Sequence, residues 1–303
     1  NFWSFATDLF TEEQGKRLFG LIGVGGSLGA VAGAVLPELV HSAVGTYALM
    51  LIAAGGLVLS AGIYVVVDRL DVRHHPEHQI VARPAHADQA IGKEGGFKLV
   101  LTHRYLRYVA AMIVIGTVIN SNGEYVIGKL VTAAGKATGH PGDYIESFYS
   151  TYYTIVNFAS LAIQSFVVTK VLGVVGIRRA LFIMPLIVLG SWVSFIAFAT
   201  LQVLRVTKTS ENSIDYSLNN TLKQALFLPT SREMKYKAKA AIDTFFVRGA
   251  DVLSAILVFL FIELAGLGVH TMAAINIALS AGWIVIAART GGLFDKQSAE
   301  AKA

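Results

Sequence analysis

The sequence predicts an all-α integral membrane protein, on the basis of its composition, the length of its apolar blocks and the distribution of its basic residues. Hydrophobic residues make up 54% of the 303-residue chain and charged residues 15%, whereas a soluble domain carries about 25% charged residues. The mean hydropathy is +0.58. The chain has no cysteine, which excludes disulfides and thiolate chemistry.

Apolar blocks long enough to cross a hydrocarbon core, which takes about 20 helical residues, recur along the chain. We expect eight spans, at residues 18–40, 46–67, 106–134, 148–172, 180–204, 210–229, 240–264 and 269–288.

Lysine and arginine test this topology, because cytoplasmic loops near span ends are enriched in them. Of the 25 basic residues, nineteen fall on one side of the predicted bundle. The other six are Lys129, Lys136, Arg205 and Lys208 on the opposite side, and Lys223 and Arg248 inside spans. We therefore expect the side with nineteen, which includes the C-terminus, to be cytoplasmic. The net charge of +5 reflects this topology and does not indicate a nucleic-acid partner.

The hydrophilic stretch 68–103 separates two spans from six and predicts the domain organisation. We expect residues 1–67 to be the remnant of an N-terminal bundle (the end of a fourth span, then spans five and six), 68–103 a cytoplasmic linker, 104–290 a six-helix bundle and 291–303 a cytoplasmic tail. The sequence opens without Met on what looks like the end of an apolar helix. About four further spans are expected before it, twelve in all.

The linker carries the segment His74-His75-Pro76-Glu77-His78. Imidazoles are ligands for transition metals, but the proline interrupts any regular ligand spacing. We expect a solvated segment rather than a metal site, and no cofactor.

Charged residues inside spans are expensive in a bilayer and indicate function. In the span 210–229 a polar stripe recurs at helical spacing and consists of Asn212, Asp215, Tyr216, Asn219 and Lys223. Such a face either lines a water-filled cavity or bonds neighbouring helices together. Lys223 is close enough to the cytoplasmic end to snorkel.

Two further groups extend the candidate site. Arg248 and Asp251 are three apart, so they either neutralise each other or hold and release an anion. Asn120 and Glu124 are four apart and share a face. Glu124 is a candidate proton site or gate, or a residue solvated at the far interface.

An aromatic and polar stripe in the span 148–172 either packs or stacks on a base. It consists of Tyr149, Tyr153, Asn157, Ser160 and Gln164. The glycine-rich run 23–29 follows no strand and is not a dinucleotide loop. Instead Gly25, Gly29 and Gly33 are spaced for close helix contact. Since no P-loop occurs, ATP hydrolysis is not implied, and we expect no enzyme activity.

Three blocks resemble the ATP/ADP translocase family of plastids and intracellular bacteria and its bacterial homologues, a divergent branch of the major facilitator superfamily. They are TEEQGKRLFG at 11–20, NSNGEYVIGK at 120–129, and YSL at 216–218 with Lys223, Pro229 and KAKAAID at 237–243. The resemblance implies a major-facilitator-like bundle. Nucleotide-exchanging members have Glu and Lys four apart and a tryptophan before the lysine, whereas here Glu124 and Lys129 are five apart with Gly128 between. Gly249-Ala250-Asp251 stands where those members have a Gly-Lys pair.

We therefore expect a secondary transporter that works by alternating access in a bacterial inner membrane and exchanges anionic metabolites such as ATP and ADP. Positive potential would come from Lys223 and Arg248. Hydrogen bonds would come from Asn120, Tyr216 and Asn219, and a gate or proton site from Glu124 or Asp251. The alternatives are a non-transporting subunit docked on a larger membrane complex, and a proton-coupled exporter.

Overall fold

The computed structural model describes residues 3, 6–7, 10, 12–74 and 95–300, and every regular element in them is a helix. Five helices there are long and apolar enough to cross a membrane: Arg104–Ala137, Pro141–Val168, Ile177–Phe198, Met234–Leu264 and Val269–Glu300. The all-α membrane fold is thereby confirmed.

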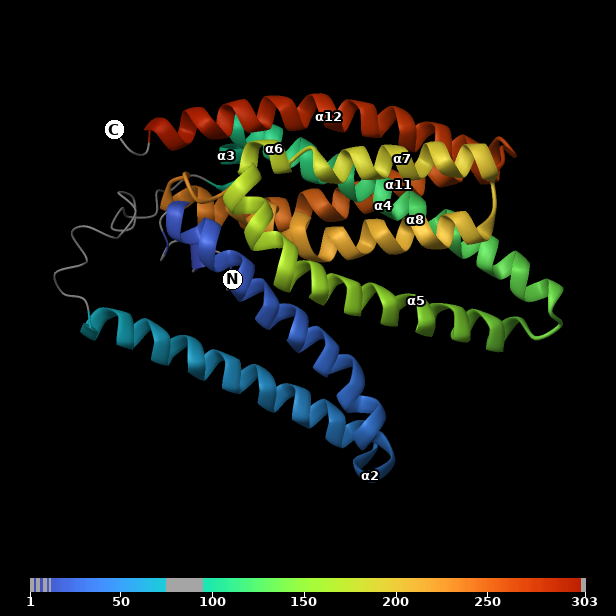
Figure 1. The fold of residues 1–303 in the computed structure, drawn as a ribbon, viewed down its shortest axis with the longest axis horizontal. Helices are drawn as coiled ribbons and strands as arrows, with labels where there is room; N and C mark the ends of the chain where they lie inside the picture. Colours follow the sequence, from blue (N-terminus) through green and yellow to red (C-terminus); the bar gives the residue numbers. More distant parts are fainter. Residues whose placement is uncertain (1–2, 4–5, 8–9, 11, 75–94, 301–303) are drawn as a thin grey trace.

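The first two predicted spans both lie in α2 (Glu12–His74). Figure 1 shows that α2 folds back sharply on itself, so that it forms two arms. The apolar stretches Arg17–Gly33 and Met50–Ile63 belong to different arms. Pro37, which cannot donate the helical hydrogen bond, lies between them.

Helices also enter both ends of the predicted linker, because α2 continues to His74 and α3 spans Gly96–Thr102. The rest of the histidine-rich segment lies outside the described residues. Within the described part, no group of three His, Cys, Asp or Glu side chains is placed to hold a metal ion.

The C-terminal bundle begins with α4 (Arg104–Ala137) and α5 (Pro141–Ile163), which η1 (Gln164–Val168) continues. Then follow η2 (Val171–Val175), α6 (Ile177–Ala180) and α7 (Ile183–Phe198). Next, α8 (Leu201–Ile214), η3 (Asp215–Asn219) and α9 (Asn220–Ala225) run end to end. After them, η4 (Met234–Ala238), α10 (Lys239–Ala241), η5 (Ile242–Phe246), α11 (Val247–Val258) and η6 (Phe259–Leu264) form one long helix, and α12 (Val269–Glu300) completes the bundle. The η elements are π-helical.

The turn between α7 and α8 corrects one predicted boundary. Ala199 adopts a left-handed conformation with φ of 47°, and the Thr200 hydroxyl caps the next helix by accepting from the Val203 amide at 3.2 Å. The predicted spans 180–204 and 210–229 therefore divide near residue 200. The helix 201–225 is too polar to count among the five apolar spans, yet it runs through the bundle (Figure 1).

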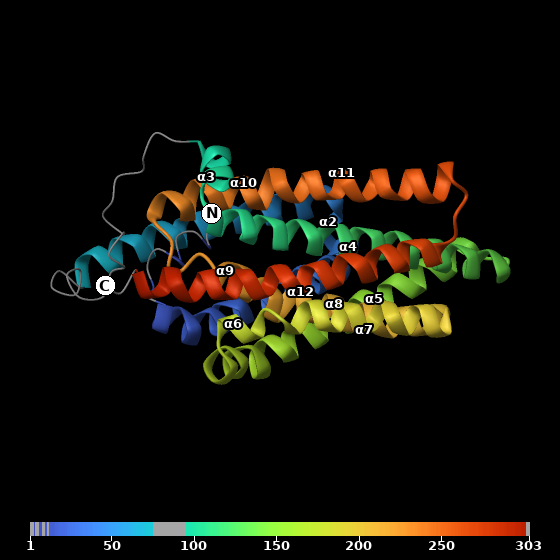
Figure 2. The same ribbon diagram turned by 90° about the horizontal axis from the view of Figure 1, so that it is seen from above.

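Packing places α4 at the centre of the bundle, against α12, α11, α5 and α8, and the first arm of α2 against α5, η1 and α9 (Figure 2). The expected glycine ridge is wrong: a Cβ added at Gly25, Gly29 or Gly33 meets no atom within 4 Å. Close contact occurs earlier in the arm, at Gly20 against Thr169 and Gly23 against Gln164. The arm diverges from the bundle beyond that point (Figure 1).

Candidate functional site

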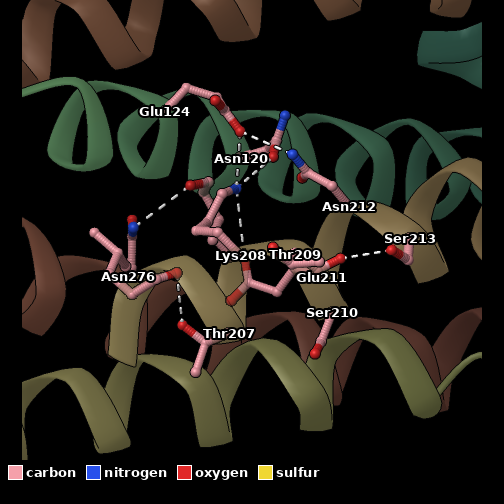
Figure 3. Close-up of polar contacts among 12 residues, drawn as sticks. Asn120, Glu124, Thr207, Lys208, Thr209, Ser210, Glu211, Asn212, Ser213 and Asn276 are labelled. Atoms are coloured by element: carbon pink, nitrogen blue, oxygen red, sulfur yellow. Dashed lines mark hydrogen bonds and ion pairs between the residues drawn. The ribbon is translucent and has the colours of Figure 1, made fainter. Parts of the chain in front are cut away.

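Lys208 on α8 is one of the fully buried charges in the described part of the bundle, with a side chain that is 0% exposed. Its Nζ donates to the Asn120 Oδ1 at 2.8 Å and lies 3.2 Å from the Glu124 Oε1 and 3.4 Å from the Glu211 Oε2 (Figure 3). We call these four residues the Lys208 hub. A buried ammonium requires such partners because leaving water costs several kcal/mol per ion.

The hub is fitted closely between α4 and α8. A Cβ at Gly123 of α4 would lie 3.1 Å from the Lys208 Nζ and 3.2 Å from the Trp192 ring, so glycine leaves the room that the lysine occupies. The Asn212 Nδ2 donates to the Glu124 Oε1 at 3.0 Å and to the Tyr152 hydroxyl at 2.8 Å. These bonds orient Glu124 towards the lysine.

Within the hub one cation faces two carboxylates. The Glu211 side chain is 3% exposed, and its Oε1 has no hydrogen-bond partner among the described residues. The hub therefore carries a formal charge of −1 in a low-dielectric setting, where each ion pair is strong and each unpaired charge is costly.

A second ion pair lies further along the same helix. The Lys223 Nζ is 3.1 Å from the Asp215 Oδ1, and the Asn219 Nδ2 donates to the same oxygen at 2.5 Å. The side chains of Lys223 and Asp215 are 28% and 24% exposed. The predicted stripe thus exists, but its lysine is held by its own aspartate.

A third ion pair joins the Arg248 Nη1 to the Asp251 Oδ2 at 3.2 Å on α11. Asp251 is also held by α4, because the Ser121 hydroxyl donates to its Oδ1 at 2.9 Å. The arginine side chain is 84% exposed, so it projects away from the bundle core.

Members of each group line a cavity of about 100 Å³, which we call the charged cavity and which residues of α4, α7, α8, η3, α9, α11 and α12 enclose. Its polar lining residues are Thr117, Asn120, Ser121, Glu211, Asp215, Lys223 and Asp251. At about 30 Å³ per water, it has room for roughly three waters. In this conformation a nucleotide does not fit inside it.

The structure thus brings most of the predicted site residues together. Lys223, Asn120 and Asp251 line the charged cavity. Glu124 reaches it through Lys208, Asn219 through Asp215, and Arg248 through Asp251.

Tyr216 belongs instead to a second cavity of about 350 Å³, which we call the neutral cavity. It is lined by Trp3, Gly23, Gly26, Ser27, Ala30, Asn157, Ser160, Gln164, Tyr216 and Asn220. Three of the five residues of the predicted aromatic and polar stripe, Asn157, Ser160 and Gln164, line it. The other two, Tyr149 and Tyr153, stack on each other with ring centroids 5.9 Å apart, and Tyr149 also lines a third cavity.

A third cavity, of about 570 Å³, lies at the opposite end of the bundle from α3 and contains Lys129 and Lys136. Lys129 lies 5.7 Å over the Tyr125 ring. Glu124 lines this cavity as well, so it stands between the third cavity and Lys208.

Sequence reasoning missed Lys208, Glu211 and the partner role of Asp215. The expectation that Lys208 lies outside the span is wrong, because α8 begins at Leu201 and carries Lys208 two turns into the bundle. The spacing was the available signal: Lys208, Glu211 and Asp215 are three and four residues apart, the helical intervals at which side chains share a face.

Other buried polar groups serve helix packing. The Asn122 Nδ2 donates to the Asn276 Oδ1 at 2.9 Å, and the Ser254 hydroxyl donates to the Asn122 Oδ1 at 2.7 Å. This triad joins α4, α12 and α11, as interhelical hydrogen bonds do in membrane proteins.

The chain matches the TLC ATP/ADP transporter family over residues 1–210. No curated protein and no solved structure matches. The match covers more than half of the chain and ends within α8, after Lys208 and before Tyr216. The two earlier resembling blocks, at 11–20 and 120–129, lie inside it. The chain therefore belongs to the TLC ATP/ADP transporter family.

Proposed function

We propose that this protein is a secondary transporter that exchanges anionic nucleotides, of the ATP and ADP type, by alternating access. Its family and the five apolar helices among the described residues make it a membrane protein of a nucleotide-transporter family. The exchange mechanism and the residues that carry it are our proposal.

The graded exposure of the three ion pairs supports this proposal. Lys208 is wholly buried and held by two carboxylates, whereas Lys223 and Arg248 each have one carboxylate partner and are 28% and 84% exposed. A phosphate oxygen accepts charge-assisted hydrogen bonds much as a carboxylate does. A phosphate arriving at Lys223 or Arg248 would therefore replace Asp215 or Asp251 as partner.

In this mechanism the release of a carboxylate from its cation, when a phosphate binds, changes the contacts between neighbouring helices. Asp251 is shared between Arg248 on α11 and Ser121 on α4, so loss of one partner changes the contact between those helices. Asn120 and Asn219 would supply neutral hydrogen bonds at the rim of the charged cavity. Because that cavity is too small for a nucleotide, helices must move apart for substrate to pass, as alternating access requires.

Transport into proteoliposomes tests this function. Proteoliposomes that contain the full-length protein and are loaded with unlabelled ADP should take up labelled ATP. This uptake should fall at least tenfold for Lys223→Ala and Arg248→Ala. Lys296→Ala is the matched control, because Lys296 is 74% exposed and pairs with Glu300 at 3.8 Å. Uptake that survives Lys223→Ala and Arg248→Ala unchanged would remove both residues from the site.

The orientation is also a proposal: the basic side, including the C-terminus, would face the cytoplasm of a bacterium. Single cysteines at Lys98, Lys296 and Lys136 test it against a cysteine-free background. The first two should be labelled from the inner face of sealed cells or vesicles and the third from the outer face. Labelling of Lys98→Cys and Lys296→Cys from opposite faces would overturn the topology.

A second candidate function is a non-transporting membrane subunit with the same fold. One observation favours it: every cation lining or adjoining the charged cavity already has a carboxylate partner, as in a packed structural core. Under this reading the wild type transports none of ATP, ADP and phosphate, with or without a counter-substrate or a proton gradient.

A further inference from the structure

We propose that the neutral cavity binds the nucleobase of the substrate, an inference that rests on the proposed nucleotide transport. The cavity lies between the first arm of α2 on one side and α5, η3 and α9 on the other. Its volume of about 350 Å³ falls in the range of small-molecule sites, about 300–1,000 Å³.

The lining of the neutral cavity matches the chemistry of a base and not that of a phosphate. None of its described lining residues is charged. Two of them, Asn157 and Asn220, carry side-chain amides, which present a donor and an acceptor side by side. Paired donors and acceptors of this kind recognise the edge of adenine, whereas phosphate groups select cations.

An aromatic ring is available beside these amides. Tyr216 lines the neutral cavity and is 46% exposed, so its ring is open to contact. Aromatic side chains stack on the face of any base. A planar heterocycle held by one face and one edge is the ligand that this combination favours.

One buried atom in the cavity lacks a partner. Ser160 is 4% exposed, and its hydroxyl oxygen has no hydrogen-bond partner among the described residues. Buried polar groups in proteins are nearly always bonded, so Ser160 contributes a hydroxyl with unused hydrogen-bonding capacity at the wall of the cavity. Gln164 is held rigid by contrast, because its Nε2 donates to the Gly20 carbonyl at 2.9 Å and to the Thr221 hydroxyl at 3.3 Å.

The neutral and charged cavities are placed to hold two ends of one molecule. Asp215 lines the charged cavity and Tyr216, the next residue, lines the neutral one. Adjacent residues point about 100° apart on an α-helix and somewhat less on the π-helical η3, so the cavities adjoin neighbouring faces of the same helix. A nucleotide lying across η3 would place its base on one face and its phosphates at the ion pairs on the other.

A glycine in the α2 arm makes the site open to a precise test. Gly26 lines the neutral cavity, and a Cβ added there meets no atom within 4 Å. Gly26→Leu should therefore fill the cavity without straining the backbone. Gly25→Leu is the matched control, because Gly25 also has open space at its Cβ, is exposed and does not line the cavity.

The experiment measures equilibrium binding of labelled ATP to the full-length protein in lipid nanodiscs, with tripolyphosphate and adenosine as competitors. Gly26→Leu and Tyr216→Ala should weaken ATP and adenosine binding about 5- to 150-fold, the effect of losing one stacked base. Tripolyphosphate, which has no base, should compete equally well in Gly26→Leu, Gly25→Leu and wild type.

Unchanged ATP binding in Gly26→Leu and Tyr216→Ala, or equal weakening of ATP and tripolyphosphate, would overturn the base site and leave nucleotide transport standing. If the wild type binds adenosine but neither ATP nor tripolyphosphate, the proposed phosphate site is wrong. Loss of that adenosine binding in Gly26→Leu would still support the base site. Wild type that binds neither ATP nor adenosine would overturn both.

Discussion

Replacing Lys208 with methionine should destabilise the protein more than the same change at Lys223. Methionine keeps the unbranched length and fills the space beside Gly123, so the change removes mainly charge. Glu124 and Glu211 would then lie without their cation, Glu211 at 3% exposure. Breaking a buried pair by removing one partner costs about 3–5 kcal/mol.

The matched comparison is Lys223→Met. Lys223 is 28% exposed and has one carboxylate partner, and such a pair contributes about 1 kcal/mol or less. At about 2 °C per kcal/mol for a chain of this size, Lys208→Met should unfold about 6–10 °C below wild type, and Lys223→Met within about 2 °C of it.

Thermal unfolding in detergent, followed by tryptophan fluorescence at a fixed scan rate, measures the difference. Adding Glu211→Gln to Lys208→Met should restore roughly half of the loss, because it removes the more buried of the two orphaned carboxylates. Equal melting temperatures for Lys208→Met and Lys223→Met would refute the reasoning, since the Lys208 hub would then contribute no more to stability than the partly exposed pair of Lys223 and Asp215.

Two further predictions concern space and charge around the same site. Gly123→Ala should lower the free energy of unfolding by about 1–3 kcal/mol, because its Cβ would lie 3.1 Å from the Nζ of the buried Lys208. Gly128→Ala in the same helix should be tolerated, because its Cβ meets its nearest atom at 3.5 Å. The unfolding temperatures of the two variants test this difference. Asp215→Asn should strengthen ATP binding about tenfold, because it frees Lys223 from its competing carboxylate. The surface variant Asp295→Asn should leave ATP binding unchanged. Weaker ATP binding in Asp215→Asn would mean that the aspartate helps to hold the ligand.

The spans could be predicted from the sequence because a bilayer imposes one length on every apolar helix. The structure keeps Arg104–Ala137 and Val269–Glu300 close to their predicted starts. The predicted span ends were wrong where no change in hydrophobicity marks the end of a helix. The helix 201–225 is polar for much of its length, so only the left-handed Ala199 and the Thr200 cap mark where it begins. The same boundary error moved Lys208 out of the membrane.

The sequence predicted which residues belong to the site better than it predicted which of them form hydrogen bonds and ion pairs with one another. Periodicity placed Asp215, Asn219 and Lys223 on one face, but a bond between residues eight apart is not expected of an α-helix, in which they are separated by about 12 Å of rise. The π-helical segment Asp215–Asn219 widens the turn, so residues four apart align more nearly and the lysine reaches back to Asp215. Tertiary contacts such as Ser121 to Asp251 have no signal in a single sequence.

The balance of charge around the charged cavity constrains how an anion can use it. Three cations, Lys208, Lys223 and Arg248, face four carboxylates, Glu124, Glu211, Asp215 and Asp251. An entering phosphate would make this region more negative still, and repulsion is strong at low dielectric. Binding is therefore favourable only if a carboxylate moves away as the phosphate takes its cation. The buried hub cannot supply that movement without losing its own partners. The two more exposed pairs, Lys223 with Asp215 and Arg248 with Asp251, can supply it. Exchange of a carboxylate for a phosphate at these pairs is therefore the step that couples substrate binding to helix movement.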